Sequence, residues 1–275
     1  MASANDGSKH LLLDKRDGVA YVTLNRPDKR NAFSPEMLVR LCDIWKDVAE
    51  DRAIRVALVT GSGDTAFSSG GDLGSTIPLM MRTRPPVGEW EERFSQDRKQ
   101  LYRAILRGAT FYKPVVAAIN GHALAGGAEF VLGTDIRVMS ETATIGVTEV
   151  RRGLIAGGGS LVRLARQVPW AMAMELALVG EPVSAQAALA MGLVNRDVPP
   201  GEVLATAEEL ARRISLGAPV ALAKTKEAMV RSNGLPVDEA FAIESQCTKD
   251  NAATADAREG PRAFMVKRPP VFTGQ

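Results

Sequence analysis

Apolar residues along this chain recur with two different periods. Nearly continuous apolar runs of strand length occur at 55–61 (RVALVTG) and 114–121 (PVVAAING), and such runs are typical of parallel strands buried on both faces. After Ser34-Pro35, a favourable helix start, apolar residues recur at helical spacing as far as Val48. Strands that alternate with helices predict an α/β fold for the first two-thirds of the chain.

The last part of the chain has a different pattern. From Ser184 onward, amphipathic helical segments follow one another, separated by Gly or Pro: SAQAALAMGL, GEVLATAEELARRIS, PVALAKTKEAMVRS and DEAFAIESQCTKDNAA. We therefore expect an α/β core over residues 1–199 and a helical region over residues 200–275. Near the N-terminus, Asp17-Gly18 between two strand-like runs predicts a β-hairpin.

Two glutamates lie close to glycine-rich turns. Residues 115–134 indicate a buried strand, a glycine turn and a helix that begins near Gly126, with Glu129 in its first turn. Residues 56–73 repeat the strand, the loop and the glycine pair. The backbone N–H groups of two such turns can converge on one ligand oxygen, as in an oxyanion hole. Because Glu149 follows a third such stretch, the sequence predicts acid/base chemistry beside a stabilised oxyanion.

Composition argues against several classes of protein. The formal net charge is +2, and Lys and Arg are interspersed with Asp and Glu, so we expect no nucleic-acid partner. The chain has no apolar run of about 18 residues and its N-terminus lacks the apolar part of a signal peptide, which predicts a soluble protein without membrane contact. Cys42 and Cys247 lie in helix-like segments and favour a reducing, cytoplasmic location. With only His10 and His122, and no G-x-S-x-G elbow, we expect neither a metal site nor a Ser-His-acid triad.

Six segments, in order and over nearly the whole chain, resemble motifs of the enoyl-CoA hydratase/isomerase, or crotonase, superfamily. They are LNRPDKRNAFS (24–34), AFSSGGDL (66–73), INGHALAGGAEF (119–130), ATIGVTEVRRGLIAGGG (143–159), SAQAALAMGLVN (184–195) and AFMVKRPPVF (263–272). The resemblance implies a spiral of ββα units followed by a helical C-terminal region that assembles homotrimers, commonly paired into hexamers. It implies no metal and no redox cofactor, because coenzyme A (CoA) is part of the acyl-CoA thioester substrate.

The resemblance also implies a reaction. Gly71 in SSGGD and Gly126 in AGGAE match the two backbone donors of the family's oxyanion hole, and Glu129 and Glu149 match its two acid/base glutamates. Water addition needs one group that takes a proton from water and one that delivers a proton to the α-carbon. The pair therefore favours reversible syn addition of water to a trans-2-enoyl-CoA, which gives a 3-hydroxyacyl-CoA. Glu129 would activate the water and Glu149 would exchange the α-proton, although this division of roles stays open.

The other matches concern CoA. Lys29 and Arg30 offer positive charge to its phosphates, and Gly157 matches a backbone position near the attacking water. Phe264 and Lys267 match C-terminal residues that reach a CoA site, in some family members that of a neighbouring subunit. The matching CoA-contacting residues of the two upstream motifs are Ala32, Ser69, Gly70, Asp72 and Leu73.

The chain departs from the hydratase pattern in places. Thr148 stands where proline commonly precedes the second glutamate, and Ala156 and Ser160 depart from a GLIPGAGG motif, so the carboxylates can be placed differently. Residues 78–94 match no fixed family pattern. They are either a surface loop or a lid whose Met80, Met81 and Trp90 line an acyl pocket.

Alternative functions are open at this point. One is a double-bond isomerase or a specialised acyl-CoA dehydratase on the same fold, although isomerases can manage with one glutamate. Another is a non-catalytic CoA-binding or RNA-associated scaffold; the intact glutamates argue against the first and the lack of a dense basic stripe against the second. A Rossmann domain would need a G-x-G-x-x-G turn directly after the first strand, which the chain lacks.

Overall fold

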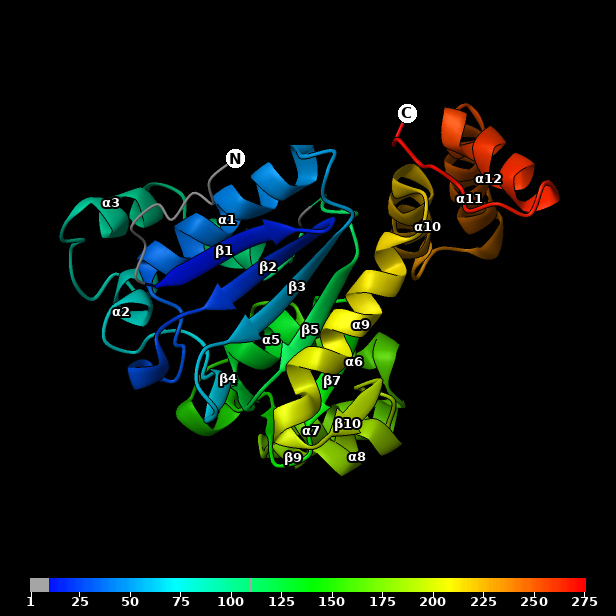
Figure 1. Ribbon diagram of the computed structural model, residues 1–275. Coiled ribbons are helices and arrows are strands. Elements are labelled where there is room, and N and C mark those ends of the chain that lie inside the picture. Colours follow the sequence, from blue (N-terminus) through cyan, green and yellow to red (C-terminus); the bar gives the residue numbers. More distant parts are fainter. Residues whose placement is uncertain (1–9, 109) are drawn as a thin grey trace.

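The computed structural model describes residues 10–108 and 110–275, and Figure 1 shows their arrangement. Residues 1–9, where we expect no signal peptide, lie outside the described residues. The larger sheet has the order β1 (Leu11–Arg16), β2 (Val19–Leu24), β3 (Val56–Gly61), β5 (Val115–Ile119), β7 (Ile136–Ser140) and β10 (Arg196–Val198). The smaller sheet has the order β4 (Ala66–Ser68), β6 (His122–Leu124), β8 (Thr144–Gly146) and β9 (Val183–Ser184).

Helices connect and cover these strands. In chain order they are η1 (Pro27–Lys29), α1 (Pro35–Glu50), α2 (Thr76–Met80), α3 (Glu89–Gln96), α4 (Gln100–Ala104), α5 (Gly126–Leu132), η2 (Glu149–Arg152), α6 (Ser160–Gln167), α7 (Trp170–Val179), α8 (Ala185–Ala190), η3 (Pro200–Glu202), α9 (Val203–Ser215), α10 (Pro219–Ser232), α11 (Val237–Ala252) and α12 (Ala255–Met265). Among the described residues, no helix is both long and apolar enough to cross a membrane.

Two local predictions are confirmed. Asp17 and Gly18 have φ of 51° and 78°, as a tight hairpin turn requires, and they join the antiparallel strands β1 and β2. Ser34 is the N-cap of α1, and its hydroxyl accepts a hydrogen bond from the Met37 amide at 3.2 Å.

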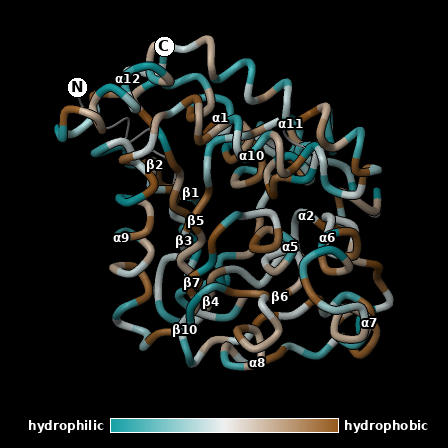
Figure 2. Tube along the Cα trace, turned by 90° about the vertical axis from the view of Figure 1, so that its right-hand side faces the viewer, coloured by the Kyte–Doolittle hydropathy of each residue, from teal (hydrophilic) through white to brown (hydrophobic). Residues whose placement is uncertain are grey.

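The larger sheet is buried on both faces, which explains its continuous apolar strands. Successive strand residues point to opposite sides, so Val59 belongs to a core shared with α1 while Leu58 belongs to a second core on the other face. Helix α9 closes that second core with Val203, Ala207 and Ala211. Figure 2 shows hydrophobic residues along β3, β5 and β7. Although α9 lies beyond residue 200, it therefore packs directly on the sheet.

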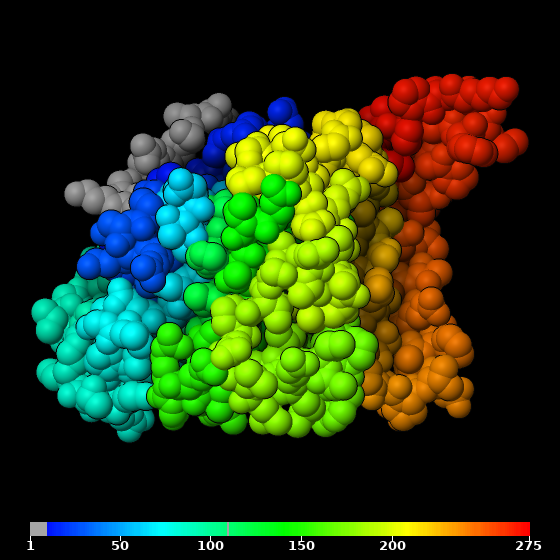
Figure 3. Space-filling model, turned by 90° about the horizontal axis from the view of Figure 1, so that it is seen from below, coloured from blue at the N-terminus to red at the C-terminus, as the bar shows by residue number. Residues whose placement is uncertain are grey.

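The last three helices project from one side of the molecule, as Figures 1 and 3 show. Helices α10 and α11 pack on each other, yet large apolar side chains on α10 to α12 face outward. Met229 is 71% exposed, Phe241 58% and Phe264 82%. Exposed apolar groups gathered in this way are typical of a surface that another subunit covers.

Candidate active site

The two glycine turns meet because their strands pair. Strand β4 runs parallel to β6, so the loops that follow both strands leave the same edge of the smaller sheet. A Cβ added to Gly70 would lie 2.7 Å from the Gly126 nitrogen, and one added to Gly126 would lie 3.4 Å from the Gly71 nitrogen. Gly70 also has φ of 89°, which L side chains rarely adopt. The close approach of these backbones therefore requires glycine.

The Gly71 and Gly126 amides can serve one ligand oxygen. In the parallel bridge between Phe33 and Gly71, the Phe33 N–H donates to the Gly70 carbonyl at 2.8 Å and the Asp72 N–H donates to the Phe33 carbonyl at 3.1 Å. The Gly71 N–H takes no part in these bonds. Gly126 is the first residue of α5, where N–H groups have no partner within the helix. Two N–H groups from different loops thus lie side by side.

The residue before Gly126 has an unusual backbone conformation. Ala125 has φ of 50° and ψ of −125°, a combination that costs a non-glycine residue roughly 1 to 3 kcal/mol. Its N–H donates to the Gly146 carbonyl at 2.9 Å, which holds the loop against β8. Such strain is retained where the surrounding structure enforces it, and here it sets the direction of the Gly126 amide.

Glu129 is held tightly by the glycine-rich segment 157–160. Its side chain is buried, and Oε1 accepts hydrogen bonds from the Gly158 N–H at 2.6 Å, the Ser160 hydroxyl at 2.9 Å and the Ser160 N–H at 3.3 Å. A Cβ on Gly158 would overlap with Oε2 of Glu129. Gly158 and Ser160 were not among the residues expected at the site. The signal for them in the sequence is the glycine run at 157–159, which ends at Ser160, a departure from the family motif.

Glu149 lies in a different environment. It begins η2, it is half-buried, and its Oε2 is buried without a hydrogen-bond partner among the described residues. Burial, followed by the negative charge of Glu129, raises the pKa of Glu149 to about 7. The charge effect also shows that the structure brings the two predicted carboxyl groups near each other. A carboxyl group with this pKa can gain and lose a proton near neutral pH.

Gly157 lies at the open edge of the site. It is exposed, its carbonyl accepts a hydrogen bond from Arg107, and a Cβ on it would have no atom nearer than the Ile155 oxygen at 3.9 Å. The adjacent Gly158, rather than Gly157, contacts Glu129.

The segments predicted to contact CoA lie together. Lys29 and Arg30 are exposed on the loop at η1, and the Ser69 N–H donates to the Arg30 carbonyl at 3.0 Å. Buried Asn31 connects the loop at η1 to β4, because its Nδ2 donates to the Ala66 carbonyl at 2.8 Å.

Asp72 and its neighbours complete this face. Burial opposes ionisation of Asp72, but the hydrogen bond from Arg26 at 2.8 Å and those from two backbone amides outweigh it, and the pKa is lowered. Arg26 also donates to the carbonyl of buried Ala32 at 2.8 Å. Leu73 is 66% exposed beside them.

The C-terminal candidates lie elsewhere. Phe264 and Lys267 are exposed at the end of α12, on the opposite side of the molecule from η1 (Figure 1). The chain therefore does not bring them to its own CoA-side loops. They lie with the projecting helices, near the exposed apolar side chains of α10 to α12.

The segment 76–106, which contains α2, α3 and α4, begins and ends at the site. Ile77 lies against Gly71, since a Cβ on that glycine would be 2.9 Å from Ile77 Cδ1. At the other end, a Cβ on Gly158 would overlap with Ile105 as well as with Glu129. Within the segment, Met80 and Trp90 pack on the core, whereas Met81 is 53% exposed.

His122 has a structural position. Its Nδ1 lies 3.0 Å from the Thr144 hydroxyl and accepts from the Thr144 N–H at 3.1 Å, which links β6 to β8. Across residues 10–108 and 110–275, no group of three His, Cys, Asp or Glu side chains could hold a metal ion.

With this fold and this arrangement of glycines and glutamates, the chain belongs to the enoyl-CoA hydratase/isomerase family, whose model matches residues 14–275. It is similar to the enoyl-CoA hydratase EchA19 of Mycobacterium tuberculosis, with 38% identity over 99% of both chains. It is also similar to the (E)-benzylidenesuccinyl-CoA hydratase of Thauera aromatica, with 36% identity over 96% of this chain and 99% of that one. A crystal structure of an enoyl-CoA hydratase from Bacillus anthracis superposes with a TM-score of 0.87 at 31% identity, covering 97% of this chain and all of the other. The expected crotonase-like α/β fold is confirmed.

Proposed function

We propose that this protein catalyses the reversible syn addition of water to a trans-2-enoyl-CoA, which yields a 3-hydroxyacyl-CoA. The observation that carries the proposal is a pair of nearby carboxyl groups in unlike environments, close to two adjacent backbone amides. Glu129 accepts three hydrogen bonds, whereas Glu149 has an unpartnered oxygen and a raised pKa. The family relatives named as hydratases support the same reaction.

In the proposed mechanism, Gly71 and Gly126 bind the thioester oxygen. As the hydroxyl of water attacks the β-carbon, electrons move through the conjugated system to that oxygen and form an enolate. Backbone N–H groups that are already oriented stabilise the new charge without rearranging, and each such donor typically contributes about 100-fold to 1,000-fold in rate. The short distances between these loops fit this role.

The glutamates divide the proton transfers. Glu129 takes a proton from the attacking water through Oε2, because its Oε1 is already held by Gly158 and Ser160. Glu149, protonated in part at neutral pH because its pKa is about 7, gives its proton to the α-carbon as the enolate collapses. One water is consumed, and a later proton transfer from Glu129 to Glu149, directly or through solvent, restores both groups.

We assign CoA to the face formed by η1 and the loop after β4. Lys29 and Arg30 would attract its phosphates, and Ala32, Ser69, Gly70, Asp72 and Leu73 would line its path. Gly157 would lie near the water. Phe264 and Lys267 would contribute from a neighbouring subunit of a homotrimer or of a hexamer. Relatives are named for benzylidenesuccinyl, carnitinyl and short-chain substrates, so acyl groups of different kinds occur among them.

Several further assignments belong to this proposal. The division into a core (1–199) and a C-terminal oligomerisation region (200–275) is supported by the exposed apolar side chains of α10 to α12. The reaction as written needs no metal and no redox cofactor. A cytoplasmic location is supported by the free thiols of Cys42 and Cys247.

The proposal is tested by incubating the purified protein with short, medium, branched and aromatic trans-2-enoyl-CoAs and following the absorbance of the conjugated thioester. We expect this absorbance to fall as the 3-hydroxyacyl-CoA forms. Parallel reactions with 3-enoyl-CoAs test the isomerase alternative. Gain of conjugation from 3-enoyl-CoAs, without hydration of any 2-enoyl-CoA, would contradict the proposed function.

A further inference from the structure

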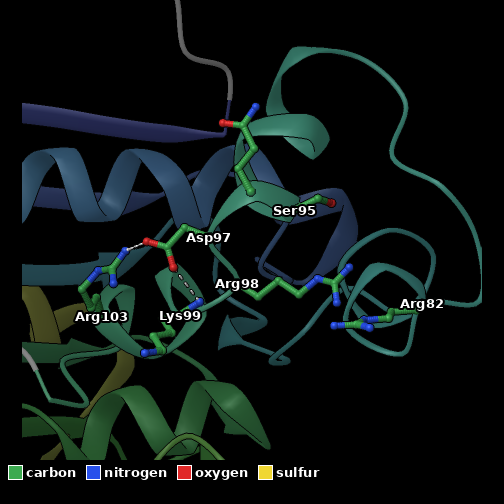
Figure 4. A pocket seen from close by; sticks show the side chains of 7 residues that line it. Arg82, Ser95, Asp97, Arg98, Lys99 and Arg103 are labelled. Carbon is green, nitrogen blue, oxygen red and sulfur yellow. Dashed lines mark hydrogen bonds and ion pairs between the residues drawn. The ribbon is translucent and has the colours of Figure 1, made fainter.

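A polar cavity lies on the segment 76–106, apart from the residues assigned above. Its volume is about 630 Å³, and Figure 4 shows the side chains that line it. They include Arg82, Ser95, Asp97, Arg98, Lys99 and Arg103. Basic side chains thus outnumber acidic ones in a cavity that the proposed reaction does not use.

The charges in this cavity are not balanced. Asp97 is its acidic member, and Asp97 already forms an ion pair with Arg103. Within the described part of the chain, neither Arg82 nor Arg98 forms an ion pair with an acidic side chain, whereas the charge of Lys99 acts on Asp97 and helps to lower its pKa. Figure 4 shows Arg98 extending toward Arg82. Like charges held close together repel, so an anion between them would be stabilised.

Two hydrogen-bond donors on residues that line the cavity also have no acceptor. The Ser95 hydroxyl and the Nε of Arg98 are buried, and neither has a hydrogen-bond partner among the residues that the structure describes. Buried polar groups are nearly always paired in native proteins, and pairing is most favourable with an ionised acceptor. A carboxylate or phosphate oxygen is such an acceptor. Neutral ligand groups would leave the positive charge unmatched.

The cavity is placed to meet the acyl end of the substrate. Ile77 lies against the oxyanion glycine Gly71, and Arg82 follows Ile77 by five residues, just beyond the end of α2 at Met80. At the far end of the same segment, Ile105 lies against Gly158 beside Glu129. Of the loops assigned to CoA, the one at η1 is separate from this segment, whereas the loop after β4 leads directly into it.

We propose that this cavity binds an anionic group, a carboxylate at the distal end of the substrate's acyl chain. The proposal rests on the proposed function, because it takes the thioester oxygen to lie at Gly71 and Gly126. A CoA phosphate has the same chemistry, but the separate basic loop at Lys29 and Arg30 is assigned to the phosphates. The substrate class is therefore an enoyl-CoA whose acyl group ends in a carboxylate.

Binding of saturated thioesters tests this site without relying on turnover. Isothermal titration calorimetry compares hexanoyl-CoA with hexanedioyl-CoA and octanoyl-CoA with octanedioyl-CoA, members of each pair differing only in a terminal methyl or carboxylate. We expect wild type to bind the carboxylate member of at least one pair about 10-fold more tightly or better, the size expected of one hydrogen bond between charged groups.

Two variants test which side chains bind the terminal carboxylate. Arg98→Gln and Arg82→Gln should each reduce that ratio toward one while leaving the affinity for the methyl-ended thioester unchanged. The matched control is Arg93→Gln, which removes the same charge from the same segment but from a residue paired with Asp43 and outside the cavity. This control should keep the wild-type ratio.

Three results would overturn the proposal. Wild type could show no preference for the carboxylate in either pair, or both cavity variants could keep the preference. Alternatively, Arg98→Gln could weaken free CoA and both members of each pair equally, which would assign the cavity to a CoA phosphate. Absence of hydration with a normal carboxylate preference would instead contradict the proposed function and leave this site supported.

Discussion

The candidate active site and the C-terminal helices differ in how far contacts within one chain complete them. At this site, a methyl group on Gly70 would clash with the Gly126 backbone and one on Gly158 would clash with Glu129, which is itself buried with three hydrogen bonds. On α10 to α12, large apolar side chains such as Phe264 face outward. Contacts within the chain complete the first region. The second exposes apolar surface of the kind that another subunit usually covers.

This contrast has a functional meaning. Chemistry that depends on fixed donors needs positions held by the fold itself, and the strained Ala125 shows that the fold bears a cost to hold them. The helices at the C-terminus carry Phe264 and Lys267, which cannot serve the site of their own chain. If the neighbouring subunit uses them, assembly and CoA binding are linked.

The largest expected effect is at the candidate active site. Glu129→Gln keeps the shape of the side chain but removes the base, so hydration should fall about 100-fold to 10,000-fold. Binding of a saturated acyl-CoA should change little. Steady-state kinetics and calorimetry measure the two quantities. A variant with more than half of wild-type turnover would show that Glu129 is not the base.

Gly158 and Gly157 are adjacent but differ in the space available for an added Cβ. In Gly158→Ala the new Cβ overlaps with Oε2 of Glu129, so we expect a loss of about 100-fold in kcat, in line with misplacement of a catalytic group. The matched control is Gly157→Ala, whose Cβ would have only the Ile155 oxygen nearby, at 3.9 Å. Equal activity of the two alanine variants would contradict the placement of Glu129.

The raised pKa of Glu149 predicts that the site costs stability. In the folded protein, Glu149 keeps its proton up to a pH of about 7, whereas in the unfolded chain it loses the proton near its usual pKa of 4.5. Its contribution to the stability of the fold is therefore full below pH 4.5 and is lost as the pH rises through about 7. Glu149→Gln stays neutral throughout. It should therefore be more stable than wild type at pH 8 by about 3 kcal/mol, because the pKa rises from 4.5 to about 7 and each pKa unit corresponds to about 1.4 kcal/mol.

Urea unfolding at pH 8 and at pH 4.5 measures this difference. At the lower pH the two proteins should have nearly equal free energies of unfolding, provided that both fold there. A variant that is less stable than wild type at pH 8 would show that ionised Glu149 is not penalised by burial. Loss of hydration activity is expected in the same variant.

The C-terminal surface gives a smaller effect per residue. Phe241 is 58% exposed on α11, and Phe241→Glu should weaken subunit association by roughly 2 kcal/mol or more if this side chain is buried in the assembly. Light scattering should show a trimer or hexamer for wild type and smaller species for the variant. The control is Val87→Glu, which changes a side chain that is 74% exposed outside these helices. A monomeric wild type at micromolar concentration would contradict the assembly.

The smallest effect is expected at the surface beside the site. Arg151 follows Glu149 by two residues and pairs with Glu181 at 2.6 Å, but both side chains are more than half exposed. Exposed ion pairs contribute about 0 to 1 kcal/mol. Arg151→Ala should therefore change the free energy of unfolding by less than about 1 kcal/mol and leave kcat near wild type. A large loss of kcat would assign this charge to the reaction.

Local features of the fold could be predicted because short-range chemistry decides them. The Asp17-Gly18 turn, the Ser34 cap of α1 and the apolar strands follow from backbone preferences and periodicity over a few residues. The spiral arrangement and the roles of Gly71 and Gly126 came from resemblance to a family, because periodicity indicates elements but not how distant strands pair. The pairing of β4 with β6 is what joins those two loops.

The sequence by itself therefore determined the elements, the glycine turns and the two glutamates as candidates. Only the tertiary structure decided their environments: Ser160, 31 positions from Glu129 along the chain, holds its carboxylate, while burial raises the pKa of Glu149. It also placed α9 on the sheet and collected Arg82 and Arg98 around one cavity. The physical reason is that burial, hydrogen bonding and charge depend on distances in space, and packing brings together residues that sequence spacing keeps apart.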